Sequence, residues 1–123
     1  VAEIMKDHHQ YKVGISESHH TGKKDAPSGT AISLAQQIIS LNSRLKSWKM
    51  SNTTSKSEIP VEAHRIPDVP GTHEIFYSSE IDTISIKHQA HSREGFGLGA
   101  VIAAEWIQNK KGVFSMQDVL NLD

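Results

Sequence analysis

The sequence predicts an α+β fold with two layers, in which a mixed four-stranded sheet carries helices on one face. Three observations lead to this prediction. Residues 11–16 alternate between apolar and polar side chains, which is the pattern of a half-buried strand. Residues 31–48 repeat apolar side chains at helical spacing. Residues 59–88 contain further strand-like segments separated by turn-forming residues, so one long helix is expected between the first two strands.

The composition is that of an ordinary globular domain, with 123 residues, 37% of them hydrophobic, and a formal net charge of -1. This length can bury a core without disulfides or a structural metal. The small net charge does not favour binding to nucleic acid or to a membrane surface, and no apolar run approaches the ~20 residues of a membrane span. The absence of cysteine excludes disulfide and thiolate chemistry and is compatible with the cytoplasmic location that we expect.

The first six residues have helix-forming composition but begin without an N-cap residue. We therefore expect them to be the end of a cut helix, and the chain to be a domain excised from a longer protein. The adjacent His8 and His9 follow in a polar loop. No third ligand with suitable spacing accompanies them, so we do not expect a metal site there.

The strand at residues 11–16 leads directly to Glu17, His19 and His20, which should lie at its carboxyl end. The helix that follows should present one apolar stripe and end before the polar run at residues 51–57. The stripe is formed by Ala31, Leu34, Ala35, Ile38, Leu41 and Leu45 and widened by Ile32, Ile39 and Trp48.

A strand is next expected at residues 59–66, with Pro60 and Pro67 near its two ends. A hairpin should follow it. The hairpin arms are residues 75–77 and 83–88, joined by the connection at residues 79–82. A sheet with helices on only one face leaves its other face available for a partner.

The pattern becomes helical again from Gly95, with apolar residues around much of the circumference. The glycines at positions 95, 97 and 99 do not have the G-x-G-x-x-G spacing of a dinucleotide-binding turn, so we do not expect them to bind a cofactor phosphate. Ser115 and Asp118 have the spacing of a capping pair at the start of a short last helix.

The chemistry of the chain is concentrated between residues 17 and 31. Ser28, Gly29 and Thr30 precede the long apolar-periodic run, as expected at a helix N-terminus, where unpaired N–H groups and the helix dipole attract anions. Cationic and proton-transferring side chains stand just before it. They are His19, His20, Lys23 and Lys24. The segment therefore predicts a site for a small carboxylate or phosphate compound on which a proton is moved.

From Glu17 the chain reads Glu-Ser-His-His-Thr-Gly-Lys-Lys-Asp-Ala-Pro-Ser-Gly-Thr-Ala, which closely resembles the hallmark of the dihydrodipicolinate reductases, also called 4-hydroxy-tetrahydrodipicolinate reductases. Residues 86–100 resemble a later segment of the family, in which Arg, Phe and Gly-Ala keep these spacings. Residues 112–122 resemble the family's C-terminus. The resemblance implies a C-terminal domain, without the family's N-terminal nucleotide-binding domain. Residues 1–94 would bind substrate and form oligomers, and residues 95–123 would be the helical segment that in the family returns to the nucleotide-binding domain.

The family's reaction belongs to bacterial lysine and diaminopimelate synthesis. A cyclic imine-containing dicarboxylate is reduced by hydride from NADPH or NADH, so the resemblance implies an oxidoreductase whose partner is a small dicarboxylate. The domain alone is expected to be inactive and to bind no cofactor, because turnover needs the nicotinamide held against the substrate. The resemblance also implies a homotetramer assembled through the uncovered face of the sheet.

The resemblance also assigns roles to individual residues. His19 would be the proton donor, with Lys23 as the other candidate. His20 and Lys23 would contact one carboxylate of the substrate. The other carboxylate would be bound by Ser28, Gly29 and Thr30. Arg93 and Phe96 would lie towards the nicotinamide, although Arg93 alone would suggest a surface ion pair and Phe96 a core residue.

Several other interpretations remain open from the residues alone. Asp25 begins a turn that could serve as the N-terminal cap of the helix, and its carboxylate could also orient a lysine. His64 and His73 have no evident chemistry, and a zinc site built from the eight histidines lacks the necessary spacing, so no metal is expected. The main alternative to a reductase domain is a non-catalytic module for homo-oligomerisation, favoured by the half-covered sheet and the apolar C-terminal segment.

Overall fold

The computed structural model describes residues 1–52 and 55–122 and divides into two compact units. The sheet unit is Val1–His91 and the C-terminal unit is Ser92–Asp123. The helices and strands of the sheet unit are α1 (Ala2–Met5), β1 (Lys12–His19), α2 (Gly29–Leu41), β2 (Ser47–Met50), β3 (Glu58–Arg65), β4 (Gly71–Ser78) and β5 (Thr83–Ala90).

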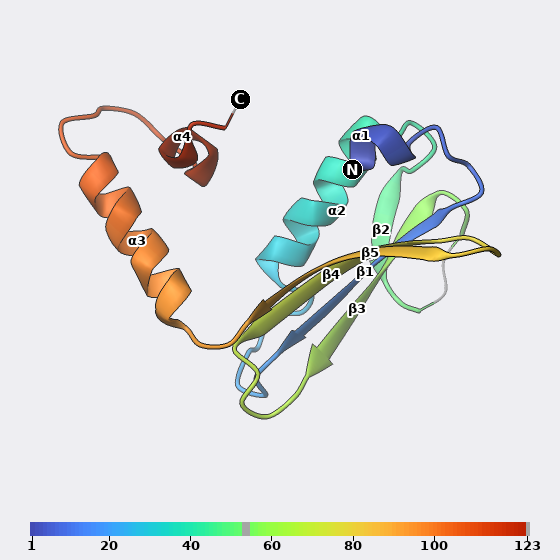
Figure 1. The fold of residues 1–123 in the computed structure, drawn as a ribbon. Helices are drawn as coiled ribbons and strands as arrows, with labels where there is room; N and C mark the ends of the chain where they lie inside the picture. The colour runs from blue at the N-terminus through green and yellow to red at the C-terminus, as the bar shows by residue number, and fades with distance from the viewer. Residues whose placement is uncertain (53–54, 123) are drawn as a thin grey trace. The chain divides into compact units, whose positions relative to one another are not determined.

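The strands form one five-stranded mixed sheet in the order β2-β3-β1-β4-β5 (Figure 1). β1 is parallel to β3 and antiparallel to β4, while β2 is parallel to β3 and β5 is antiparallel to β4. The predicted α+β class and mixed sheet are therefore confirmed. The predicted number of four strands is wrong, because the short edge strand β2 was not expected.

The predicted length of the helix is also wrong, because α2 ends at Leu41 and does not continue to Trp48. Asn42 follows α2 in an extended conformation (φ -123°, ψ 99°), and its side-chain oxygen accepts a hydrogen bond from the backbone N–H of Arg44. The polar residue thus replaces the next helical turn with a local side-chain interaction. Trp48 instead lies in β2 and pairs with Ile59 of β3. Its position at helical spacing from the apolar residues of α2 therefore did not indicate that the helix continues.

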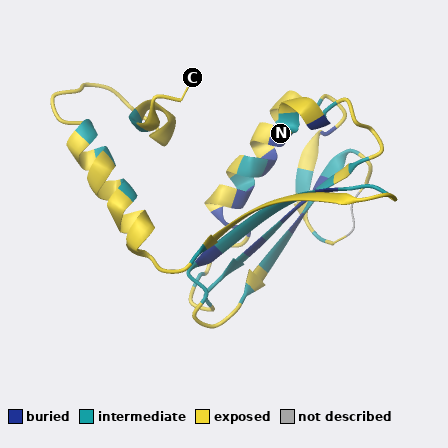
Figure 2. Cartoon of the chain, in the orientation of Figure 1, coloured by how far each residue is buried: buried dark blue, intermediate teal, exposed yellow. Residues whose placement is uncertain are grey.

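The hydrophobic core lies between the sheet and α2, which packs against β1 and β2, while α1 packs against α2. Figure 2 shows buried residues on the side of α2 that faces the sheet. The core side chains are Ile15, Ala31, Ala35, Ile38, Leu45, Ile59 and Val61. Burying one isoleucine of this kind contributes about 1.5–3 kcal/mol. Leu45 belongs to the core as predicted, although it lies after the end of α2.

The second face of the sheet has no helix packed on it among the described residues of the sheet unit. Alternation along β1 places Val13, Ile15 and Glu17 on the helix-covered face and Gly14 and Ser16 on the open face. Gly14 pairs with Phe76 of β4, and a Cβ atom at position 14 would lie 2.3 Å from Cζ of that ring. The open face is therefore shaped by an aromatic ring lying over a glycine.

The C-terminal unit contains α3 (Glu94–Trp106) and α4 (Met116–Leu120). The predicted capping pair is confirmed, since Asp118 accepts a hydrogen bond from the backbone N–H of Ser115 at 2.6 Å. The rings of Trp106 and Phe114 meet edge to face at 5.2 Å. Neither helix of this unit has a buried residue.

Candidate functional site

The candidate site is built where β1 ends and α2 begins. Figure 1 shows the arrowhead of β1 and the first turn of α2 at the same end of the sheet. A helix begins at this segment, as predicted. Ser28, and not Asp25, is the N-cap of α2, and its Oγ accepts a hydrogen bond from the N–H of Ala31 at 3.2 Å. Gly29 and Thr30 form the exposed first turn. Among the described residues, neither of their N–H groups has an acceptor, as expected at a helix N-terminus.

The centre of the site is Glu17, which is only 1% exposed. Arg65 donates from Nη1 to Oε2 at 3.0 Å and from Nη2 to Oε1 at 3.1 Å. The backbone N–H of Ser28 donates to Oε1 at 3.0 Å, and Nδ1 of His19 lies 2.5 Å from Oε2. Burial acts to raise the pKa of Glu17, but the bonds from Arg65, His19 and Ser28 outweigh it and lower that pKa. Glu17 is therefore a buried, ionised carboxylate.

The sheet register explains why these residues meet. Glu17 pairs with Ala63 of β3 and with His73 of β4, and His19 pairs with Arg65. Because β1 and β3 are parallel, their carboxyl ends reach the same edge of the sheet. The side chains that meet there extend the apolar stripes of their strands, in which Val13 and Ile15 precede Glu17, and Ile59 and Val61 precede Arg65.

His73, for which the sequence indicated no chemistry, is part of the same cluster. Its Nε2 lies 2.9 Å from Oγ of Ser28, and its ring meets that of His19 edge to face at 5.0 Å. Burial, followed by electrostatic repulsion from His19, lowers the pKa of His73. Nε2 of a neutral His73 can accept a hydrogen bond from the hydroxyl of Ser28, whose oxygen already accepts one from the N–H of Ala31.

The loop between His20 and Ser28 holds Lys23 in place. Its Nζ donates to both carboxylate oxygens of Asp25, at 2.9 Å each, and this bond lowers the pKa of Asp25. The expectation that Asp25 could orient a lysine is thus confirmed. Arg65 also binds this loop, through the carbonyls of Lys23 at 3.3 Å and Asp25 at 2.6 Å. Lys24 is exposed.

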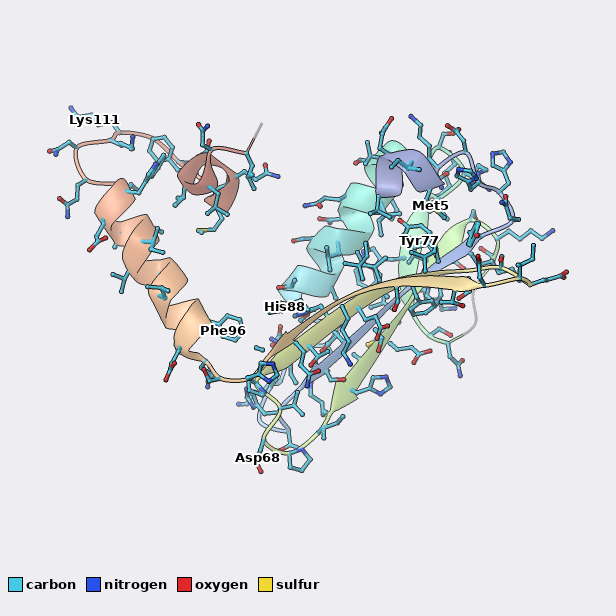
Figure 3. All side chains as sticks on the ribbon, in the orientation of Figure 1. Met5, Asp68, Tyr77, His88, Phe96 and Lys111 are labelled. Carbon is cyan, nitrogen blue, oxygen red and sulfur yellow. The ribbon has the colours of Figure 1, made fainter. Side chains whose placement is uncertain are left out.

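The structure therefore brings several of the predicted site residues together around Glu17. Glu17 bonds to both His19 and Ser28, and Arg65 connects it to the loop of Lys23. His20 lies next to them, half-buried, at the end of β1. Figure 3 shows His88 of β5 at this end of the sheet, in register with His73. Arg93 and Phe96 belong to the C-terminal unit, where both are exposed.

Sequence reasoning missed Arg65, and it treated Glu17 only as a residue delivered by its strand. A signal for both was present. Each is a charged residue at the end of a strand, on the side that otherwise carries apolar residues, and the two charges are opposite. Such residues are rarely buried unless they are paired with each other.

No group of three or more metal-ligating side chains comes together in residues 1–52 and 55–122. Within the same ranges, no helix has the length and apolar character needed to cross a membrane.

A cavity of about 580 Å³ lies near the start of β1, away from the residues clustered around Glu17. Its lining includes Tyr11, Leu45, Pro60 and Tyr77, and it includes none of the predicted site residues. This cavity is the alternative location for a bound ligand when the candidate site is tested.

The chain matches the family model described as "Dihydrodipicolinate reductase, C-terminus" over residues 1–120. It is 51% identical to the 4-hydroxy-tetrahydrodipicolinate reductase of Christiangramia forsetii over 121 residues, which are 98% of this chain and 50% of that protein. The reductase of the same name from Rickettsia bellii is 41% identical over 118 residues, covering 94% of this chain and 47% of that protein.

A solved structure has the same fold. The dipicolinate-bound dihydrodipicolinate reductase from Paenisporosarcina sp. TG-14 aligns with a TM-score of 0.63 and 23% identity, covering 95% of this chain and 50% of that chain. The chain thus spans about half the length of the curated relatives it matches.

Proposed function

Because this chain belongs to the dihydrodipicolinate reductase family, of which it matches the C-terminal domain, we propose that it is the substrate-binding domain of an NAD(P)H-dependent 4-hydroxy-tetrahydrodipicolinate reductase. The whole protein would form tetrahydrodipicolinate for lysine biosynthesis, in the cytoplasm. Residues 1–94 would bind substrate and residues 95–123 would contact the nucleotide-binding domain. One observation carries the proposal: the buried Glu17 carboxylate bonds to both the candidate proton donor, His19, and the start of α2.

The proposed reaction needs a proton where hydride addition leaves negative charge. We assign that donation to His19, with Lys23 as the alternative donor. NADPH or NADH would supply the hydride, and Arg93 and Phe96 are the residues of this chain assigned to the nicotinamide side. Their exposure, 52% in the case of Phe96, suits contact with a group outside the chain.

The substrate carboxylates are assigned to two sets of donors. His20 and Lys23 would bind one of them, and the free N–H groups of Gly29 and Thr30 would bind the other. The positive end of the α2 dipole favours an anion at the second position. Ser28 is assigned to the same carboxylate, and its direct contact would require a bond to Glu17 or His73 to be exchanged for one to the ligand.

The test is calorimetric titration of the 123-residue chain with pyridine-2,6-dicarboxylate at millimolar concentration. We expect measurable binding without catalytic turnover. The Lys23→Ala variant should lose most of the affinity, at least about tenfold, because a charge-assisted bond to a carboxylate contributes about 1.5–3 kcal/mol. Lys24→Ala is the matched control, since it removes the same charge from an exposed neighbouring residue.

Two results would contradict the proposal. The first is the absence of binding heat while circular dichroism shows an intact fold. The second is equal affinity in the wild type and Lys23→Ala, which would place the carboxylate elsewhere.

The open face of the sheet favours a second role, in homo-oligomerisation, which we propose as a homotetramer through this face. Ser16 lies on it, between Glu62 of β3 and Glu74 of β4. An arginine at position 16 could pair with these acids within one chain while obstructing a partner, so Ser16→Arg should convert the tetramer to smaller species in sedimentation velocity. Ser33→Arg, on the exposed side of α2, is the control. A wild-type monomer would contradict this role.

A further inference from the structure

We propose that Glu17 is a positioning residue, whose buried carboxylate holds His19 with a proton on Nδ1 and so reserves Nε2 for the ligand. The inference rests on the proposed function, in which His19 is the proton donor. It concerns a residue to which neither the sequence pattern nor the family resemblance gave a role.

The hydrogen bonds at the Glu17 carboxylate determine which nitrogen of His19 carries a proton. Oε1 accepts from Arg65 and from the N–H of Ser28, and Oε2 accepts from Arg65. The remaining contact of Oε2 is Nδ1 of His19, at 2.5 Å. An ionised carboxylate can only accept hydrogen bonds, so Nδ1 must donate. Neutral His19 is then the Nδ1–H tautomer, and its Nε2 carries the lone pair. Proton donation to the substrate takes place from the imidazolium form, which loses its proton at Nε2 and keeps the proton on Nδ1.

In the alternative arrangement, a protonated Glu17 would donate a hydrogen bond to Nδ1. That arrangement would leave the partly buried guanidinium of Arg65 opposite a neutral acid, without a charged partner. Arg65 donates two bonds to the two oxygens of Glu17, the geometry in which Arg binds an ionised carboxylate. The arrangement therefore favours the ionised form.

Among the described residues, Nε2 of His19 has no hydrogen-bond partner, while the ring is packed edge to face on His73. The side chain of His19 is 12% exposed. One ring nitrogen is thus used by the protein and the other is left for a ligand, as in other sites where a carboxylate fixes the tautomer of a histidine.

The charged groups around His19 come from several elements. Glu17 lies on the same strand, Arg65 on β3 and His73 on β4. Lys23 is in the loop that Arg65 binds. Arg65 therefore acts on both proton-donor candidates, since it keeps Glu17 ionised for His19 and holds the backbone of Lys23.

The experiment is nitrogen NMR of the chain with ¹⁵N-labelled histidine, at a pH where His19 is neutral. The wild type should show Nδ1 protonated and Nε2 unprotonated for His19. An unconstrained imidazole prefers the opposite tautomer, so a wild-type His19 with the proton on Nε2 would overturn the inference. This measurement is decisive even where a variant does not fold.

The variant Glu17→Gln tests the cause. Its side-chain amide can donate as well as accept, so His19 should shift towards a mixture of tautomers. Glu62→Gln is the matched control, because Glu62 lies on the opposite face of the neighbouring strand β3 and should leave the tautomer unchanged. A folded Glu17→Gln variant with an unchanged tautomer would overturn the role of Glu17.

Titration with pyridine-2,6-dicarboxylate separates this inference from the proposed function. Binding in the wild type together with the Nε2–H tautomer would refute the positioning role and leave the substrate site intact. The Nδ1–H tautomer without binding would refute the substrate site and leave the contact between Glu17 and His19 standing as a structural one.

Discussion

At the scale of single residues, the buried carboxylate of Glu17 and the partly exposed guanidinium of Arg65 form an ion pair that also organises the polar groups around it. Such a pair contributes little net stability, because desolvation offsets the attraction, but removing Arg65 would leave the carboxylate buried without its charged partner, which costs up to about 3–5 kcal/mol. Among the described residues, no buried side-chain nitrogen or oxygen lacks a hydrogen-bond partner. Every buried polar side-chain atom of the cluster around Glu17 is thus hydrogen-bonded, which favours a single arrangement of these side chains.

His73 should make the stability depend on pH above the range in which carboxylates titrate. Its pKa is lowered by burial and by His19 from an ordinary value of 6.5, so in mildly acidic solution the unfolded chain binds this proton more readily than the folded one. The free energy of unfolding should therefore fall as the pH drops below about 6.5. Urea unfolding at a series of pH values measures this decrease. His73→Gln should reduce it, and an unchanged decrease in that variant would contradict the prediction.

Glu17 should act at lower pH. Its folded pKa lies below the ordinary value of 4.5, so the stability that its ionised form contributes is present above about pH 4.5 and is lost as the pH falls through the folded pKa. Urea unfolding of Glu17→Gln should show lower stability near neutral pH and a shallower loss in acid. Glu62→Gln is the control again. A variant as stable as the wild type at pH 7 would contradict the importance of the pair.

At the scale of elements, the central strand β1 makes close contacts on both faces of the sheet. One side packs against α2 and the other carries the contact between Gly14 and Phe76. Gly14→Ala should destabilise the fold by about 1–3 kcal/mol, as overpacking does elsewhere, measured by thermal or urea unfolding. Because the obstructing atoms belong to one ring, the cost should largely disappear in the Phe76→Ala background.

A matched glycine in a helix should behave in the opposite way. Gly97 lies inside α3 with no atom within 4 Å of an added Cβ, so Gly97→Ala should leave stability unchanged or raise it by up to about 1 kcal/mol. An equal cost at both glycines, or a cost at Gly14 that persists without Phe76, would refute the steric explanation.

The elements that the sequence predicts correctly are those with local signals. The alternation around Val13 and Ile15 identified β1, and Ser28 identified the start of α2. Leu45 and Trp48 misled the prediction, because their spacing continues that of α2 although the chain turns at Asn42. The four-residue strand β2 depends on pairing with β3, which a local pattern does not contain.

The same distinction applies to the site. The run from His19 to Thr30 is visible as a continuous segment. The bond between Glu17 and Arg65 joins residues 48 positions apart, and it can be inferred only once β1 and β3 are known to be parallel neighbours. The role of His73 likewise depends on the register of β4 with β1.

At the scale of the whole molecule, the two units differ in how they are stabilised. The sheet unit contains the entire buried core among the described residues, whereas α3 and α4 bury none of their side chains. Large apolar residues of the C-terminal unit, such as Phe96, Leu98 and Val101, are 52%, 61% and 54% exposed. An apolar surface of this kind indicates a partner, and the proposed partner is the nucleotide-binding domain.

Deleting residues 92–123 should therefore leave the sheet unit folded. We expect a cooperative thermal transition and a melting temperature within about 5 °C of the full chain, a change that corresponds to roughly 1 kcal/mol in a domain of this size. Circular dichroism measures both. A truncated chain that does not fold, or that loses cooperativity, would show that the C-terminal unit contributes to the core.

The most direct test of the central claim is an NMR titration of the chain with pyridine-2,6-dicarboxylate, followed by backbone amide and histidine shifts. Binding at the candidate site should give the largest changes at Gly29 and Thr30, with smaller ones at His19 and Lys23. Changes concentrated instead around Tyr11 and Tyr77, which line the cavity near the start of β1, would contradict it.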